Sequence, residues 1–444
     1  MFPRNITGYM EEWFKGVRRK PMLLRGARQT GKTSAVRLFA GKLPGYIELN
    51  MEAPREKSVF EQQLPVRDLV KSIRLSRGKT ASLEESLLFI DEIQACPSAI
   101  GYLRLLYEEV PELAVIASGS LLEVYLLKSG IEFPVGRVTH CYMHPLSFRE
   151  YLRVFQKEDM LDLLGTIPLP DYAFPAIYRE FVKFALSGGM PEIVQAAVDR
   201  KESGSVSNLY SSLLTSFLDD VPKYASNRTM AEVIRHCLEV APAETGSRIK
   251  FAGFGNSSYR SREVSEAMKT LQRAMLLSLT YPTGEVIPPP RPNLRKSPKL
   301  FYLDSGLLAY SLGAQWSEIG TEDLNSAFNG ALAEQCVAQA LMKSNVTLQF
   351  WARDSRGSSA EVDFVVQHKE KMIPVEVKSG ATGRLRSLHR YIEDCPHQYA
   401  VRFCGGPVRV DLLCTPAGKE YKLMNLPHFL AGDLHYYLNW LIEN

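Results

Sequence analysis

Short apolar segments alternate with longer segments of helical periodicity over the first 120 residues of this 444-residue chain. Residues 22–24, 46–49, 87–90 and 114–117 each have the length and composition of a buried strand, and helical patterns separate most of them. Strands that alternate with helices favour a parallel sheet with helices on both faces. The pattern therefore predicts an α/β domain at the start of the chain.

The pattern changes twice in the remainder of the chain. Helical periodicity dominates residues 146–240 and is interrupted at 187–191, where glycines and a proline cluster. Residues 229–280 predict three helices followed by a strand. Two further strands are expected at 361–366 and 373–377, within a second mixed α and β region. The chain is therefore expected to contain more than one domain, as its length also suggests.

A phosphate-binding loop follows the first predicted strand. It matches the pattern G-x-x-x-x-G-K-[ST] at every fixed position through Gly26, Ala27, Arg28, Gln29, Thr30, Gly31, Lys32 and Thr33. Ser34, also predicted to bind the nucleotide, continues the chain as a helix, so the backbone amides at the helix N-terminus would point at the bound anion. Lys32 would reach the outer phosphates, and the Thr33 hydroxyl would hold Mg²⁺. The loop predicts binding of ATP with Mg²⁺.

Two acidic residues supply the parts needed for hydrolysis. Asp91 and Glu92 end the predicted strand at 87–90, which places them at the carboxyl edge of the sheet beside the nucleotide. Asp91 would hold Mg²⁺ through its water shell, and Glu92 would polarise the attacking water. Ser118 ends the next predicted strand and is a candidate for sensing the γ-phosphate. The alternative is that Ser118 only belongs to an ordinary turn at the end of the strand.

Arg137 is a candidate for stabilising charge on the transferring phosphate. Such an arginine comes from the same chain or from a neighbouring subunit, and the second case would make the protein a homo-oligomer. Most arginines on loops are simply solvated, and residue type alone does not separate the two readings.

These motifs together resemble prokaryotic AAA-type, archaeal-ATPase-like P-loop ATPases that carry a C-terminal restriction-endonuclease-like domain of unknown function. The resemblance runs through the loop at 26–33, the acidic pair and Ser118, then residues 136–137, 145–151, 188–192 and 301–307. It covers nearly the whole chain and implies a nucleotide-sensing role for Arg137. It indicates architecture more firmly than a biological role.

A basic segment occupies the middle of the chain. Residues 223–299 contain 13 lysines and arginines but only six glutamates and no aspartate, an excess of seven positive charges. A helix with Arg260, Arg262, Lys269 and Arg273, followed by a strand and a turn at 283–284, is typical of a winged helix that binds DNA. Winged helices in such ATPases also serve as lids or packing units, and a charged helix face is often only solvated.

The C-terminal third contains a second candidate active site. Glu376 and Lys378 are two residues apart on a predicted strand and therefore share one face. If the preceding strand forms a hairpin with it, Asp363 lies beside them in the D…E-x-K arrangement of restriction-endonuclease-like nucleases. Asp363 and Glu376, with Glu334 from a preceding helix, would hold Mg²⁺, and Lys378 would orient or activate the attacking water. Alternating charges on a solvated strand give the same pattern.

Charge, cysteine content and hydropathy indicate which partners and which cellular compartment to expect. The net charge of +4 does not require a nucleic-acid partner, so the argument for DNA depends on where the charge lies. Seven scattered cysteines without a C-x-x-C pair argue against a disulfide framework and favour the cytoplasm. No apolar run is long enough to span a membrane, so no membrane partner is expected.

The sequence therefore predicts a three-part α/β protein. Residues 1–205 would form a P-loop ATPase core with a helical extension, residues 206–318 a winged-helix-like module, and residues 319–444 an α/β endonuclease-like domain. The preferred function is a Mg²⁺-dependent ATPase whose nucleotide state controls a DNA-binding and nuclease-like C-terminal region. The alternative is a nucleotide-switched regulatory or scaffold protein whose nuclease-like domain is catalytically silent.

Overall fold

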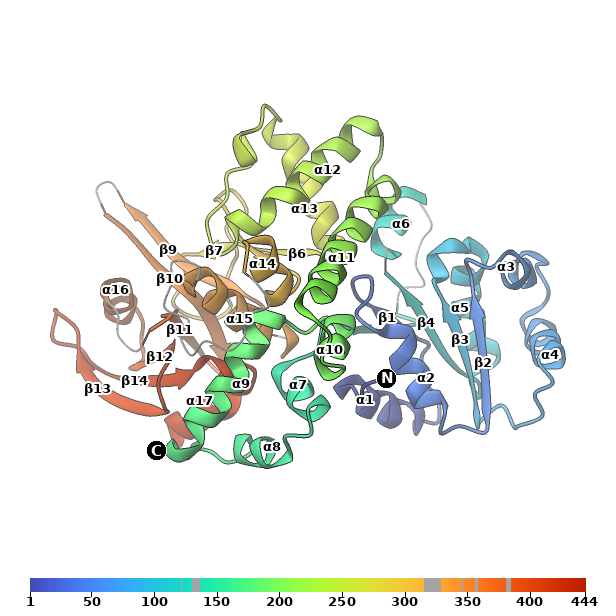
Figure 1. Ribbon diagram of the computed structural model, residues 1–444, viewed down its shortest axis with the longest axis horizontal. Coiled ribbons are helices and arrows are strands. Elements are labelled where there is room, and N and C mark those ends of the chain that lie inside the picture. Colours follow the sequence, from blue (N-terminus) through green and yellow to red (C-terminus); the bar gives the residue numbers. More distant parts are fainter. Residues whose placement is uncertain (121, 130–135, 315–328, 345, 356–357, 381–384) are drawn as a thin grey trace. The chain divides into compact units, whose positions relative to one another are not determined.

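The computed structural model describes residues 1–120, 122–129, 136–314, 329–344, 346–355, 358–380 and 385–444 (Figure 1). The described chain forms two compact units. The first unit comprises residues 1–146, 220–231 and 273–276, and the second comprises residues 147–219, 232–272 and 277–444. The domain limits expected from the sequence remain predictions.

A five-stranded sheet organises the first unit, with all neighbouring strands parallel and in the order β2-β3-β4-β1-β5. Its strands are β1 (Met22–Arg25), β2 (Gly45–Asn50), β3 (Ser86–Asp91), β4 (Ala114–Gly119) and β5 (Thr139–Tyr142). Its helices are α1 (Asn5–Phe14), α2 (Lys32–Ala40), α3 (Pro54–Glu61), α4 (Val66–Ser76), α5 (Pro97–Glu109) and α6 (Leu122–Ser129). The predicted parallel sheet is confirmed.

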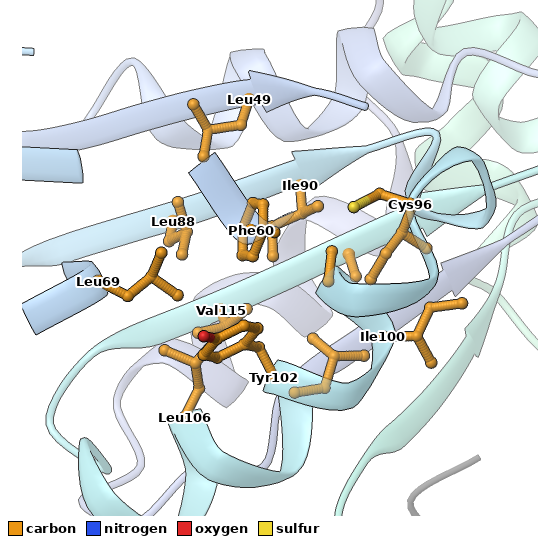
Figure 2. Close-up of a cluster of buried hydrophobic side chains, with 14 of the residues drawn as sticks. Leu49, Phe60, Leu69, Leu88, Ile90, Cys96, Ile100, Tyr102, Leu106 and Val115 are labelled. Carbon is orange, nitrogen blue, oxygen red and sulfur yellow. The ribbon is translucent and has the colours of Figure 1, made fainter. Parts of the chain in front are cut away.

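Helices cover both faces of this sheet because its strands are apolar on both sides. Alternate residues such as Leu87 and Phe89 pack with Val36 and Phe39 of α2 and with Met10 of α1. Leu88, Ile90 and Val115 point to the other face, where they pack with residues of α3, α4 and α5 (Figure 2). Two-sided burial explains why the strands are continuous apolar runs in the sequence.

The second unit begins with a helical region. Its helices are α7 (Phe148–Val154), α8 (Glu158–Leu164), α9 (Phe174–Ser187), α10 (Pro191–Val198), α11 (Ser203–Tyr224), α12 (Arg228–Val240), α13 (Ser261–Arg273) and α14 (Ser305–Ser311). The sequence break at 187–191 separates α9 from α10, as predicted. Three of these helices are divided between the units, since residues 220–224 of α11, residues 228–231 of α12 and Arg273 of α13 lie in the first unit.

A buried aspartate joins the α9–α10 turn to the start of α14. Asp304 is fully buried and accepts a hydrogen bond from the Gly189 N–H at 2.8 Å. The same carboxylate caps α14 by accepting from the N–H groups of Gly306 and Leu307. Gly188 has a φ of 69°, and a Cβ on it would lie 1.9 Å from Asp304 Oδ1. Both recurring motifs, 188–192 and 301–307, therefore form one packing contact.

The middle region differs in two respects from the winged helix that the sequence predicts. Three helices are expected over residues 229–280. The structure has two α-helices there, α12 and α13, with only short 3₁₀ turns between them, so the prediction of a third full helix is wrong. Strand β6 (Leu277–Thr280) pairs antiparallel with β8 (Lys299–Tyr302), and the connection runs from 281 to 298. The turn expected at 283–284 does not join β6 to β8 as in a wing, because β7 (Pro282–Thr283) pairs with β9 (Gln349–Ser355) of another sheet.

The C-terminal part of the second unit is a mixed sheet of seven strands in the order β13-β14-β12-β11-β10-β9-β7. Its other strands are β9 (Gln349–Ser355), β10 (Ser358–His368), β11 (Lys371–Val377), β12 (Tyr399–Cys404), β13 (Arg409–Cys414) and β14 (Glu420–Pro427). Strands β10 and β11 form the predicted antiparallel hairpin. Helices α15 (Asn329–Lys343) and α16 (Arg386–Asp394) pack on the sheet, and α17 (Leu434–Glu443) ends the chain.

Candidate functional site

The phosphate-binding loop connects β1 to α2 and is shaped by its glycines. Gly31 has a φ of 92°, a left-handed conformation that disfavours side chains. Gly26 approaches the backbone of Met143 so closely that a Cβ would lie 2.3 Å from its carbonyl oxygen. Arg4 supports the loop from outside by donating to the carbonyls of Thr30 and His144. Arg4 was missed from the sequence because it precedes the motif by more than 20 residues.

Lys32 lies inside the loop rather than in solvent. Its ammonium donates to the carbonyl oxygens of Gly26 and Ala27, both at 2.9 Å. Burial lowers the pKa of Lys32 to about 8, against the opposing effect of the Glu92 and Asp91 carboxylates. The side chain is thus held where the loop backbone would surround a phosphate.

Thr33, Asp91 and Ser118 meet at the carboxyl edge of the sheet. The Thr33 hydroxyl donates to Asp91 Oδ2 at 2.7 Å, across 58 residues of sequence. The fully buried Ser118 hydroxyl donates to Asp91 Oδ1, which also accepts from the Glu92 N–H. A hydroxyl and a carboxylate side by side are suitable donors for Mg²⁺, so these residues fit the predicted ion.

Glu92 leaves β3 with a φ of 49°, a left-handed conformation that is uncommon for a residue with a side chain. Its carboxylate accepts a hydrogen bond from the Gln94 side chain. Gln94 was not predicted as a site residue, although it lies only two positions from Glu92 in the motif. The contact holds the predicted water-polarising carboxylate beside the loop residues.

Arg28 connects the loop to helix α11. Its Nη1 atom lies 2.6 and 2.7 Å from the two carboxylate oxygens of Asp220. The Asp220 side chain is 3% exposed and is also paired with Lys223 at 2.9 Å. Because all three residues belong to the first unit, this ion-pair group links the phosphate loop to the C-terminal end of α11.

Arg137 lies away from the other nucleotide-site residues. It precedes β5, and β5 runs parallel to β1 with Thr139 opposite Met22. The phosphate loop follows the other end of β1, so Arg137 lies at the opposite edge of the sheet. Its guanidinium pairs with Glu108 of α5 at 2.9 Å. This placement argues against contact with the nucleotide of its own chain and leaves a role toward a neighbouring subunit as a prediction.

The predicted recognition helix α13 is amphipathic. Val264, Met268 and Leu271 are buried on one side. The basic residues predicted to face DNA are exposed: Arg260, Arg262, Lys269 and Arg273. Two other basic residues of the segment, Arg248 and Lys299, instead pair with carboxylates inside the second unit. The positive surface is therefore smaller than the sequence count suggests.

The C-terminal carboxylates come together as predicted. Phe364 of β10 lies opposite Val375 of β11, which places Asp363 next to Glu376, and Asp363 Oδ2 accepts from the Val377 N–H at 2.9 Å. Lys378 donates to Glu376 Oε1. Burial raises the pKa of Glu376 to about 7, with the Asp363 charge acting in the same direction.

A lysine that the sequence did not single out occupies the centre of this group. Lys299 Nζ lies 2.8 Å from Glu334 Oε1, 2.9 Å from Glu361 Oε1 and 3.2 Å from Asp363 Oδ1. Burial alone would lower the pKa of Lys299, but the three carboxylates outweigh it and hold the pKa above its usual range. No local sequence signal marks Lys299, whereas the spacing of Glu361 and Asp363 on one strand does mark a shared face.

These residues do not fit a divalent cation as they are arranged. Glu334 and Asp363 already share the Lys299 ammonium, a buried positive charge that opposes entry of a divalent cation. In the part of the chain that the structure describes, no group of three or more His, Cys, Asp or Glu side chains is arranged to hold a metal ion. The predicted Mg²⁺ site of Glu334, Asp363 and Glu376 is not supported by this geometry.

Comparison with known proteins identifies the N-terminal region. Residues 18–152 match the family described as an AAA domain, and residues 178–318 and 329–419 match two domains of unknown function (DUF8612 and DUF4143). No curated protein matches the chain. The chain therefore contains an AAA domain of the P-loop ATPase type, which suggests binding and hydrolysis of ATP.

Two archaeal proteins are among the similar solved structures. The Walker-type ATPase PABY2304 of Pyrococcus abyssi is 16% identical with a TM-score of 0.44, covering 70% of this chain and 96% of that chain. The ORC2 protein of Aeropyrum pernix, solved in ADPNP–ADP complexes, is 12% identical with a TM-score of 0.31, covering 68% of this chain and 90% of that chain.

None of the helices among the described residues is long and apolar enough to cross a membrane.

Proposed function

We propose that this protein is a Mg²⁺-dependent ATPase whose nucleotide state controls a DNA-binding region. The observation that carries the proposal is the contact between the Thr33 hydroxyl and Asp91, which joins the phosphate loop to the acidic end of β3. Mg²⁺, when bound with ATP, supplies positive charge at the transferring phosphate. Thr33 and Asp91 would hold that ion, and Asp91 is kept in place by Ser118.

The other residues of the site have separate tasks. Lys32 would exchange its two carbonyl partners for the outer phosphates and neutralise part of their charge. Glu92 would orient the attacking water and accept its proton, once its carboxylate is released from Gln94. Ser118 is buried against Asp91, so its role is to position that carboxylate rather than to contact the γ-phosphate directly.

Two observations support control of the DNA-binding region by nucleotide. The Arg28–Asp220 contact links the phosphate loop to α11, a helix with residues in both units. Helix α13 exposes Arg262, Lys269 and Arg273, whose charges suit the phosphate groups of a duplex, with the acidic Glu266 exposed among them. We therefore propose that α13 contacts DNA. We also propose that nucleotide binding acts on α11 through the Arg28–Asp220 contact.

A second candidate function is a nucleotide-switched scaffold whose C-terminal domain is catalytically silent. It is favoured by the ion pairs that already engage Asp363 and Glu376. In this case the protein would hydrolyse ATP slowly and leave DNA intact.

An ATPase assay on matched variants tests the proposal. Lys32→Ala should lose nucleotide binding, and Glu92→Gln should retain binding but lose at least about 100-fold in turnover, the usual contribution of a positioned general base. Lys79→Ala and Glu61→Gln, which change exposed residues of the same unit, serve as controls. Unchanged turnover in both site variants would refute the proposed ATPase.

A further inference from the structure

The centre of the C-terminal carboxylate group has the geometry of an ammonium site. Lys299 is 2% exposed, and its Nζ atom lies within 3.2 Å of one oxygen from each of three carboxylates. An ammonium has three N–H donors and no acceptor, so three carboxylate oxygens satisfy it completely. The Phe350 ring, 5.4 Å from Nζ, covers the ammonium on another side.

Other cations of the same chain pair with the outer carboxylate oxygens. Arg248 Nε lies 2.6 Å from Glu361 Oε2, and the Arg248 guanidinium stacks 5.0 Å from the Phe350 ring. Lys378 pairs with Glu376. Each of the four carboxylates thus has a cationic partner from this chain, or shares one, although Glu376 Oε2 is buried without a hydrogen-bond partner among the residues that the structure describes.

We propose that the Lys299 ammonium takes the place that a divalent cation would have among Glu334, Glu361 and Asp363, so that the C-terminal domain binds no catalytic metal. Lys299 is fixed at this position because its strand, β8, pairs with β6 and its backbone forms a bridge with Arg248. The pairing fixes only the backbone, and the ammonium is held by its three carboxylate partners, which would lose their shared cation if the side chain turned away. A divalent ion would have to enter beside a buried positive charge, which repels it.

The same ion pairs give the cluster a structural role. Lys299 is on β8, Glu334 on α15, and Glu361 and Asp363 on β10, so one side chain joins three elements that are distant in sequence. Removing one partner of such a buried group leaves charges without compensation and is strongly destabilising. The cluster therefore acts as a clamp between the β6–β8 hairpin and the seven-stranded sheet. This inference does not depend on the proposed ATPase.

The test is calorimetric titration of the nucleotide-free full-length chain with MnCl₂. Every protein compared carries Asp91→Asn, which silences the ATP site. We expect no saturable Mn²⁺ binding and the same response after Asp363→Asn is added. Saturable binding that Asp363→Asn abolishes would overturn the proposal, and this comparison requires no change at Lys299.

A second variant tests the ammonium directly. Lys299→Met should melt about 5–15 °C lower, because three buried carboxylates lose their cation. It should also gain saturable Mn²⁺ binding that Asp363→Asn removes. Lys250→Met changes an exposed lysine of the same segment and should melt like the parent. An unchanged melting temperature for Lys299→Met, or Mn²⁺-dependent plasmid cleavage by the parent that Lys378→Ala abolishes, would contradict the proposal.

Discussion

The ion pair between Arg28 and Asp220 makes a quantitative prediction about ATP binding. Arg28 lies in the phosphate loop with its guanidinium paired to Asp220, so a phosphate group of ATP that binds Arg28 would compete with Asp220. If that competition opposes binding, Asp220→Asn should tighten ATP binding. The substitution preserves the shape of the side chain and removes its charge.

The magnitude follows from the geometry of the contact. A hydrogen bond to a charged group contributes roughly 1.5–3 kcal/mol, and the 35% exposure of the Arg28 side chain reduces this to about 1–2 kcal/mol. We therefore expect Asp220→Asn to bind ATP roughly 5- to 30-fold more tightly. Lys223, the other partner of Asp220, remains in the variant. Its charge is positive and is not expected to oppose ATP binding.

Isothermal titration with ATP and Mg²⁺ measures this effect. Asp219→Asn, an exposed neighbour on the same helix, is the matched control and should bind like the parent. The gain should be larger for ATP than for ADP if Arg28 meets the γ-phosphate. A folded Asp220→Asn protein with equal or weaker ATP affinity would refute the coupling.

Three other predictions address the remaining features. The double substitution Arg262→Gln, Lys269→Gln should lower the slope of log affinity against log salt for a DNA duplex by about one to two, as loss of one or two phosphate contacts requires; an unchanged slope in fluorescence anisotropy would remove α13 from the DNA site. Arg137→Ala should lose ATPase activity that an excess of Lys32→Ala protein restores, if the arginine acts on a neighbouring subunit; normal activity of the single variant would exclude that role. Burial lowers the pKa of His428 to about 4. An unfolded histidine titrates near 6.5, so stability from the neutral ring is complete above that pH and is lost as pH falls toward 4, by about 2 kcal/mol at pH 4.5. His428→Gln should flatten this dependence in urea unfolding measured at pH 7 and 4.5, and an equally steep loss in the variant would refute the assignment.

The nucleotide site could be predicted from the sequence because its chemistry lies in short continuous motifs. The loop at 26–33 and the acidic pair after β3 each fix a residue at the end of a strand, and parallel strands bring their carboxyl ends to one edge. Ser118 was placed at the correct edge for the same reason, although its contact is with Asp91. No strand was predicted at 139–142, so the sequence could not show that Arg137 precedes β5 and lies at the opposite edge of the sheet.

The C-terminal site shows the limit of such reasoning. Strand alternation placed Asp363, Glu376 and Lys378 together correctly. Lys299 is 35 residues from Glu334 and 64 from Asp363, and in the sequence it is one of many basic residues in a positive segment. Only the fold shows that it is buried among acids rather than exposed to a ligand. The predicted wing was wrong for a similar reason. Thr283 pairs with a strand more than 60 residues away in the sequence, which local sequence does not indicate.

The contact between the α9–α10 turn and Asp304 constrains the sequences that this fold can accept. A Cβ at Gly188 would collide with the Asp304 carboxylate, and one at Gly306 would lie 2.2 Å from the Ser187 carbonyl oxygen. Shortening Asp304 to make room would deprive three backbone N–H groups of their acceptor. No second-site change at Asp304 can therefore suppress a substitution at either glycine. In a saturation library, these three positions are expected to tolerate almost no substitution.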